Sequence, residues 1–207
     1  MTDRFTSFRR MRRGAIAVAV TAALAGPVCA AGMPEIPVAE REIPSTEREA
    51  WRTVIGWPTA CEEAYRATIG GKRSGMVFHD LGGGHCLVEI ACASGAYQGF
   101  AVFAGIEMTR KSPGSRMLSF PIFESRDNGN LERRESGEVW GTVTFDPGTR
   151  RLTVLNRFRG PGDCGTHVVY RFRNGTPVLE EARAKPECDG RGAEHPEKWP
   201  LIERPCR

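Results

Sequence analysis

Several familiar catalytic signatures are missing from this 207-residue sequence. It has no G-x-S-x-G nucleophile motif and no H-E-x-x-H metalloprotease motif. The glycine run at residues 82–86 (GGGHC) lacks the lysine and the hydroxyl of a phosphate-binding loop, so it is typical of a turn between strands. We therefore expect no catalytic residues, no cofactor and no enzymatic activity. A hydrolase with an unrecognised site is the least favoured alternative.

Spacings that would hold a metal ion are also missing. The chain has four histidines, and no C-x-x-C or H-x-x-x-H pair supports a cluster of His79, His85 and Cys86. The oxygen-rich stretch at residues 126–130, followed by Glu132, lacks the full alternating series of a calcium loop. We expect a polar turn there and no metal site.

A surplus of positive charge is found only in the first thirty residues. The chain has 29 Lys and Arg against 25 Asp and Glu, but residues 1–30 account for five arginines and one aspartate. The remainder therefore carries 24 residues of each sign and is neutral overall. A neutral domain is a poor candidate for a nucleic-acid-binding protein, so we expect no nucleic-acid partner.

The basic N-terminus has the composition of a signal peptide. Its arginines precede a short apolar stretch at residues 15–25, and the small residues Ala30 and Ala31 follow the helix breakers Gly26 and Pro27. We predict a signal peptide at residues 1–30, with cleavage after Ala30 or Ala31 and no transmembrane segment afterwards. The expected location is the periplasm or the extracellular space.

Beyond the signal peptide, the sequence predicts a tether and one domain. Residues 31–45 have three prolines among charged residues and predict an extended tether, followed by a single domain at residues 46–207. The pairs Thr46–Glu49 and Thr59–Glu62 fit the capping box and predict two short helices. From residue 76, short apolar segments alternate with glycine-rich turns. The expected fold is mostly β, with antiparallel meander sheets in a sandwich- or barrel-like arrangement, short N-terminal helices and disulfide staples.

The second half of the chain predicts a four-stranded meander. Residues 139–145, 152–159, 167–173 and 176–184 are the expected strands, and Asn174-Gly175 suits a type I′ hairpin turn. The alternation fails at Leu155 and Asn156, which requires either a bulge or a hydrogen-bond partner for the Asn156 amide. Strand parity predicts that one face packs in the core through Val139, Val143, Phe145, Leu152, Val154, Phe158, Val168, Tyr170 and Phe172.

Six cysteines remain after the signal peptide, and an exported protein is expected to pair them in three disulfides. Across the Asn174-Gly175 turn, Cys164 and Cys188 both lie just beyond the open end of one hairpin, which predicts a bond between them. This bond makes Cys164 in the segment GPGDCGT (residues 160–166) a structural residue rather than a nucleophile. The pairing of Cys61, Cys86, Cys92 and Cys206 stays open. Two of them, Cys86 and Cys92, are about 20 Å apart if they share a strand, so they cannot bond to each other.

The polar face of the meander is the candidate binding surface. Parity places four arginines there, Arg157, Arg159, Arg171 and Arg173. Their guanidinium groups would bind carboxylate or phosphate groups of an anionic partner. The alternative is an ordinary solvated face, with Glu138 opposite Arg157 and Glu180 near Arg171. The adjacent Glu180 and Glu181 should point to opposite faces of their strand, which argues against a glycosidase pair.

Five short motifs resemble one uncharacterised family. They are GAYQ at residues 95–98, GDCGT at 162–166, Y-x-F-x-x-G at 170–175, EC-x-G at 187–190 and the Trp199-Pro200 pair. Over roughly residues 60–202 the chain resembles domain-of-unknown-function family 1176, secreted proteins of Gram-negative bacteria. The resemblance implies a β-rich periplasmic fold and supplies no catalytic residues.

Together these observations predict a periplasmic or secreted binding module. Its partner would be a protein or an anionic component of the cell envelope. The alternative from a different class is a periplasmic inhibitor of an exported hydrolase such as lysozyme, for which small disulfide-bonded β domains are suitable scaffolds. The inhibitor hypothesis requires a rigid protruding loop.

Overall fold

The computed structural model describes residues 42–71, 73–108, 114–126, 130–191, 193 and 195–205. All of them belong to one compact unit, Met33–Arg207. The predicted signal peptide, most of the predicted tether and Cys206 lie outside the described residues.

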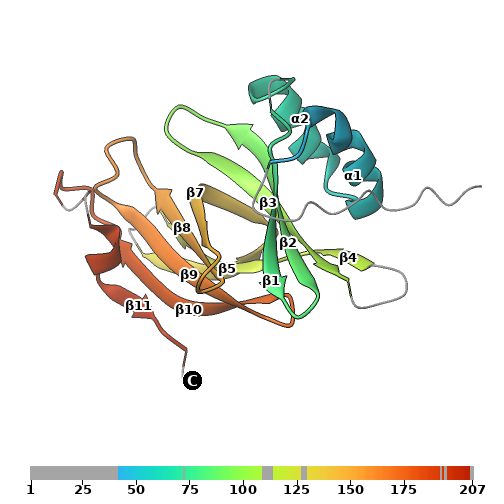
Figure 1. The fold of residues 1–207 in the computed structure, drawn as a ribbon. Helices are drawn as coiled ribbons and strands as arrows, with labels where there is room; N and C mark the ends of the chain where they lie inside the picture. Colours follow the sequence, from blue (N-terminus) through green and yellow to red (C-terminus); the bar gives the residue numbers. More distant parts are fainter. Residues whose placement is uncertain are drawn as a thin grey trace, which may run out of the picture. The chain divides into compact units, whose positions relative to one another are not determined.

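The described part of the chain is mostly β, as predicted, with two short α-helices before the first strand (Figure 1). The helices are α1 (Arg48–Ile55) and α2 (Thr59–Thr68), and single 3-10 turns form η1 (Ser45–Glu47) and η2 (Pro196–Lys198). The strands are β1 (Met76–Gly82), β2 (His85–Ser94), β3 (Gly99–Glu107), β4 (Gly114–Met117), β5 (Phe120–Ser125), β6 (Leu131–Ser136), β7 (Glu138–Asp146), β8 (Arg151–Arg157), β9 (Gly165–Arg173), β10 (Thr176–Lys185) and β11 (Leu201–Glu203).

Most of these strands form one antiparallel sheet in the order β1-β2-β3-β7-β8-β9-β10-β11, with β4 paired to β3. The predicted meander is its second half, β7 to β10. The turn between β9 and β10 is the predicted two-residue turn, because Asn174 and Gly175 both have positive φ, 49° and 70°. A separate hairpin, β5-β6, packs against the inner side of the sheet through Phe120 and Phe123.

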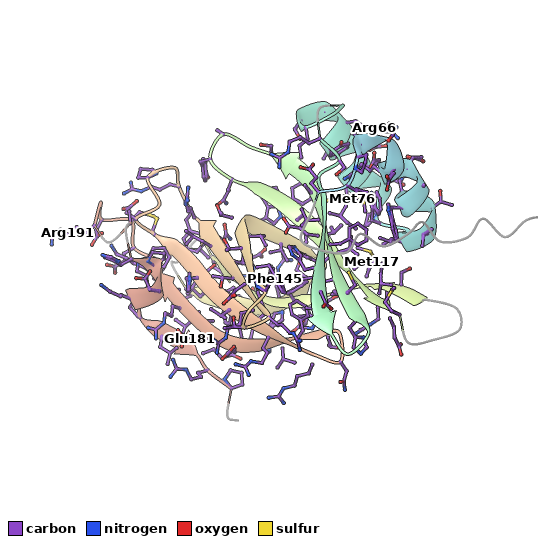
Figure 2. The ribbon with its side chains drawn as sticks, in the orientation of Figure 1. Arg66, Met76, Met117, Phe145, Glu181 and Arg191 are labelled. Atoms are coloured by element: carbon purple, nitrogen blue, oxygen red, sulfur yellow. A yellow bond between two sulfur atoms is a disulfide. The ribbon has the colours of Figure 1, made fainter. Side chains whose placement is uncertain are left out.

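Two hydrophobic clusters lie on the two sides of β1, β2 and β3. One cluster joins these strands to the helices, and it includes Trp51, Met76 and Phe78. The other joins Leu87 and Phe103 to the meander and to β5. In Figure 2, Met76 lies toward the helices and Phe145 lies between β1 and the later strands. Because one cluster contains residues from both halves, the sheet folds back so that its early and late strands face each other.

A disulfide fixes the helical layer to β2, and a buried ion pair joins its two helices. Cys61 of α2 bonds to Cys92 of β2. Beside this bond, Arg48 and Glu62 are 3% and 4% exposed, and Arg48 Nε donates to Glu62 Oε2 at 3.0 Å. Trp57 Nε1 donates to the same oxygen at 3.2 Å. These partners compensate charges that would be costly to bury alone.

The helix starts are close to those predicted, but the capping boxes are absent. Helix α2 begins at Thr59 and α1 begins at Arg48, and neither has a side-chain hydrogen bond at its cap. The carboxylate of Glu62 does not reach back to the helix start because it bonds to Arg48 and Trp57. Burial of this carboxylate therefore overrides the local capping pattern.

The described end of the predicted tether packs partly against the domain. Glu42 forms a β-bridge with Val77, and Ile43 is 4% exposed in the cluster beneath the helices. The Glu42 carboxylate accepts a hydrogen bond from the Gly75 backbone N–H at 2.8 Å. An apolar side chain and a bonded carboxylate thus hold residues 42 and 43 against the domain, while Pro44 and Ser45 are exposed.

The predicted core face of the meander is largely present. Val139, Leu152, Val154, Val168 and Tyr170 are buried, and Val143, Phe145 and Phe172 pack at the edge of the same cluster. Phe158 is half-buried and lies beyond the end of β8.

The break in the alternation near Asn156 is resolved by a hydrogen-bond partner. The Gln98 amide donates to Asn156 Oδ1 at 2.9 Å, and Gln98 Oε1 accepts from the Arg157 backbone N–H at 2.9 Å. Gln98 thus fastens the β2-β3 turn to β8.

Candidate anion-binding site

A β-bulge in β10 builds the site. The pairing of β10 with β9 shifts between Leu179 and Glu181, so Glu180 is an extra residue in the ladder. Leu179 and Ala182 both point into the core, with exposures of 5% and 0%. Three positions rather than two separate these core residues, so Glu180 and Glu181 share the outer face. The expectation that they point to opposite faces is wrong, because it assumed an unbroken strand.

Each of the two glutamates binds a pair of arginines. Arg151 donates to the two oxygens of Glu180 from Nε at 2.8 Å and from Nη2 at 2.6 Å. Arg171, which lies opposite Arg151 across β8 and β9, donates to the same oxygens at 3.4 and 3.2 Å. Arginines from β8 and β9 thus bind the same carboxylate, that of the bulge residue Glu180.

The second pair is formed on Glu181. Arg183 Nε donates to Glu181 Oε1, and Arg204 Nη2 donates to Glu181 Oε2. Arg183 also donates from Nη1 to the Trp199 carbonyl at 2.9 Å, which ties the C-terminal segment to β10. Figure 2 shows Glu181 on the β10 side of the molecule. Hydrogen bonds to Glu180 and Glu181 therefore orient these four arginines.

These ion pairs keep both carboxylates ionised. Hydrogen bonds from Arg151 and then Arg171 lower the pKa of Glu180 to about 2. Hydrogen bonds from Arg183 and then Arg204 also lower the pKa of Glu181. A general acid of a glycosidase needs a raised pKa, so this pair is unsuited to that role.

A groove of about 590 Å³ opens beside the two glutamates. Three arginines line it, Arg171, Arg173 and Arg204, and two of these, with Arg151 and Arg183, make up the four arginines bound to the two carboxylates. Among the residues that the structure describes, Arg173 has no acidic partner. The groove is lined by Arg171, Arg173, Val178, Leu179, Glu180, Glu181, Arg204 and Pro205. We call it the arginine groove.

The structure separates the four arginines predicted to form one patch. Arg171 and Arg173 line the arginine groove. Arg159 lies past the end of β8 and forms a bidentate ion pair with Asp163 at 2.8 and 2.5 Å. The side chain of Arg157 lies against Gly162, so close that a Cβ atom added at this glycine would be 3.1 Å from it. Glu138 pairs across the sheet with Val102 rather than with Arg157.

Sequence reasoning missed Arg151, Arg183 and Arg204 as members of the site. A signal for the bulge is present in the sequence, because the buried positions Pro177, Leu179, Ala182 and Ala184 are spaced two, three and two residues apart. The change of spacing marks the point where the strand phase slips. Arg204 has no such signal, since its position depends on how the C-terminal segment returns to β10.

The segment GPGDCGT has a structural role. Cys164 bonds to Cys188, which is the predicted pair. Asp163 is 1% exposed, and it accepts hydrogen bonds from Arg159 and from the Gly190 backbone N–H at 2.6 Å. Arg159 also donates to the Cys188 carbonyl at 3.1 Å. The disulfide and this network restrain the same loop, while Gly160 and Pro161 at its tip are exposed.

The expectation that every cysteine after the signal peptide is bonded is wrong for Cys86. Cys61 bonds to Cys92, and Cys86 is a free thiol buried on the same strand as Cys92. Cys206 lies outside the described residues. Burial, and then the nearby charge of Asp80, raises the pKa of Cys86 to about 12. Such a thiol is a small apolar core residue rather than a nucleophile.

The histidines do not gather at one site. The rings of His79 and Phe145 are tilted by 35° with centroids 4.5 Å apart, and His79 Nε2 lies 3.4 Å from Glu89 Oε2. His85 lies opposite Glu107 and against Gly175, where both line a separate pocket of about 230 Å³. Within the described residues, no group of three or more His, Cys, Asp or Glu side chains is arranged to hold a metal ion. Glu132 of the considered calcium loop forms an ion pair with Arg126, and residues 127–129 lie outside the described residues.

No helix in the described ranges combines the length and the apolar character needed to cross a membrane.

Comparison with known proteins identifies a family without a known function. Over 118 residues the chain is 30% identical to the uncharacterised protein YpfG of Escherichia coli (strain K12), a match that covers 56% of this chain and 31% of YpfG. The matched region therefore spans about a third of the length of that relative. No solved structure matches the chain significantly. The model of the family described as protein of unknown function (DUF1176) matches residues 12–204, so the chain belongs to this family.

Proposed function

We propose that this protein is an exported binding module that takes an anionic component of the cell envelope in the arginine groove. The observation that carries the proposal is the arrangement on the bulge, where two glutamates orient four arginines beside Arg173, which has no acidic partner among the described residues. Fixed guanidinium groups lose little conformational freedom when an anion binds. An excess of arginine over glutamate also attracts negative charge to the groove.

Export supports an envelope partner. The structure contains two disulfides, Cys61–Cys92 and Cys164–Cys188, and structural disulfides are typical of oxidising compartments. We propose that a cleavable signal peptide at residues 1–30 delivers the chain to the periplasm. Anionic groups are abundant on the envelope surfaces that the protein would meet there.

Co-sedimentation with isolated outer-membrane fragments tests the proposal. The variant replaces Arg173 and Arg204 with glutamine, and its matched control replaces Arg52 and Arg66 of the helical layer, which removes the same charge away from the groove. We expect the groove variant to bind at least about tenfold more weakly at low salt, since the loss of even one hydrogen bond to a charged group costs about 1.5–3 kcal/mol. Its binding should also depend less on salt.

The control variant should bind like the wild type. Equal weakening of both variants would reduce the effect to net charge and contradict the proposal. Melting temperatures of both variants show whether the fold is intact.

The restrained loop gives the inhibitor hypothesis one supporting observation. Gly160 and Pro161 are exposed, while Asp163, Arg159 and the Cys164–Cys188 bond fix the loop around them. An inhibitor of an exported hydrolase such as lysozyme would use a rigid loop of this kind. Lysis of bacterial cell walls by purified lysozyme, with and without the protein, tests this second candidate. Undiminished lysis at a molar excess of the protein would reject lysozyme as the target.

A further inference from the structure

The hydrogen-bond donors left over in the arginine groove differ between its arginines. A guanidinium has five N–H donors. Arg171 uses one donor of Nε and one of Nη2 on Glu180, which leaves three. Arg173 has no hydrogen-bond partner among the described residues, which therefore use none of its five donors. Arg204 uses one donor on Glu181 and keeps four.

Arg171 and Arg173 present these donors to the same space. They are two positions apart on β9, so their side chains leave the same face of the strand about 7 Å apart at the backbone. Both line the groove, and Arg204 lines it from the C-terminal segment. An anion between them would thus meet guanidinium groups from two separate parts of the chain.

We infer, resting on the proposed function, that the anion taken by this groove is a phosphate monoester held between Arg171 and Arg173, with Arg204 completing the site. A carboxylate has two oxygens with about four acceptor positions, which the free donors of Arg171 and Arg173 exceed. A phosphate monoester has three strong acceptor oxygens and close to two negative charges at neutral pH. It therefore matches both the number of donors and the excess of positive charge better than a carboxylate does.

The net charge of the groove favours a strongly charged anion. Glu180 and Glu181 line the groove and stay ionised, so they repel an anion that approaches. The attraction to the arginines and the repulsion by the glutamates both grow with the charge of the anion. Four arginines bind the two glutamates and Arg173 adds a further positive charge, so a doubly charged phosphate gains more net attraction than a singly charged carboxylate does.

Paired probes test the inference. Glycerol 3-phosphate and glycerate present a phosphate monoester and a carboxylate on similar soluble molecules, and isothermal titration calorimetry compares their affinities. Vesicles of phosphatidylcholine that contain phosphatidic acid or phosphatidylserine present the corresponding groups on a membrane, and co-sedimentation compares them. We expect at least about tenfold preference for the phosphate monoester in one or both settings. Preference only on vesicles identifies a lipid as the source, and preference in solution identifies a free phosphate ester.

The variant Arg173→Lys distinguishes bidentate binding by the guanidinium from an effect of charge alone, because lysine keeps the positive charge but lacks the planar pair of N–H donors. We expect this variant to lose most of the preference for phosphate, while Arg66→Gln on α2 keeps the preference of the wild type. An unchanged preference in Arg173→Lys would overturn the inference.

The failure of the inference and the failure of the proposed function are distinguishable. Equal binding of phosphate and carboxylate probes, lost in the Arg173→Gln and Arg204→Gln double variant, rejects phosphate but leaves an anion-binding groove. No binding of any probe, with binding to outer-membrane fragments retained, also rejects phosphate and points to another envelope anion. No binding to probes or fragments rejects both.

Discussion

Removal of the Cys164–Cys188 disulfide should destabilise the fold by a calculable amount. The two cysteines are separated by 24 residues, and the loop-entropy model assigns a closed loop of this length about 3.5 kcal/mol at 25 °C. In a chain of this size each kcal/mol shifts the melting temperature by roughly 2–4 °C, so the Cys164→Ala and Cys188→Ala double variant should melt about 7–14 °C lower. The ion pair of Arg159 with Asp163 stays in place, so the folded loop should keep its conformation.

The second disulfide provides the comparison. Cys61 and Cys92 are 31 residues apart, so the loop term is nearly equal, but both sulfurs are buried whereas Cys188 is exposed. The Cys61→Ala and Cys92→Ala variant should therefore lose more stability, because it also leaves a cavity in the core beneath the helices. Differential scanning calorimetry under non-reducing conditions measures both. This reasoning would be refuted if the double variant of Cys164 and Cys188 had the melting temperature of the wild type, or a melting temperature lower than that of the Cys61 and Cys92 variant.

Three further measurements follow from the structure. The lowered pKa of Glu180 stabilises the fold above about pH 4.5, and this contribution is lost as the pH falls toward about 2. The variant Glu180→Gln should therefore melt at a lower temperature than the wild type at pH 7, and the two melting temperatures should converge in acid. A difference in melting temperature that stays constant with pH would contradict the ion-pair account. Cys86 should resist maleimide in the native protein and react after denaturation, and peptide mapping that finds rapid native labelling would show that its thiol is accessible. Protein recovered from the periplasm should have an intact mass that lacks residues 1–30 or 1–31, and a mass that retains them would reject the signal peptide.

The meander was predictable because its signals are local. Asn174-Gly175 marks a tight turn, and the strict alternation around Leu152 and Tyr170 identifies the core face. The same hairpin arithmetic brings Cys164 and Cys188 together, since both flank its open end. A hydrogen-bond partner for Asn156 was one of two alternatives that the sequence allowed, and nothing local identifies Gln98 as that partner.

The features that escaped prediction depend on contacts distant in the sequence. Simple strand alternation places Glu180 and Glu181 on opposite faces of β10, and the bulge at Glu180 brings both carboxylates to the same face. Glu62 looks like a capping residue until Arg48 is placed beside it in the interior. In these cases the fold brings the charged residues together, and the local sequence pattern does not show the pairing.

The arginine groove is tested most directly by nuclear magnetic resonance of its guanidinium groups. Spectra of the side-chain Nε–Hε groups, recorded as glycerol 3-phosphate is added, follow each arginine separately. The account predicts saturable shifts for Arg171, Arg173 and Arg204, with Arg66 on α2 unaffected. Shifts of equal size at Arg66 and Arg173, or shifts that do not saturate, would contradict a specific anion site in this groove.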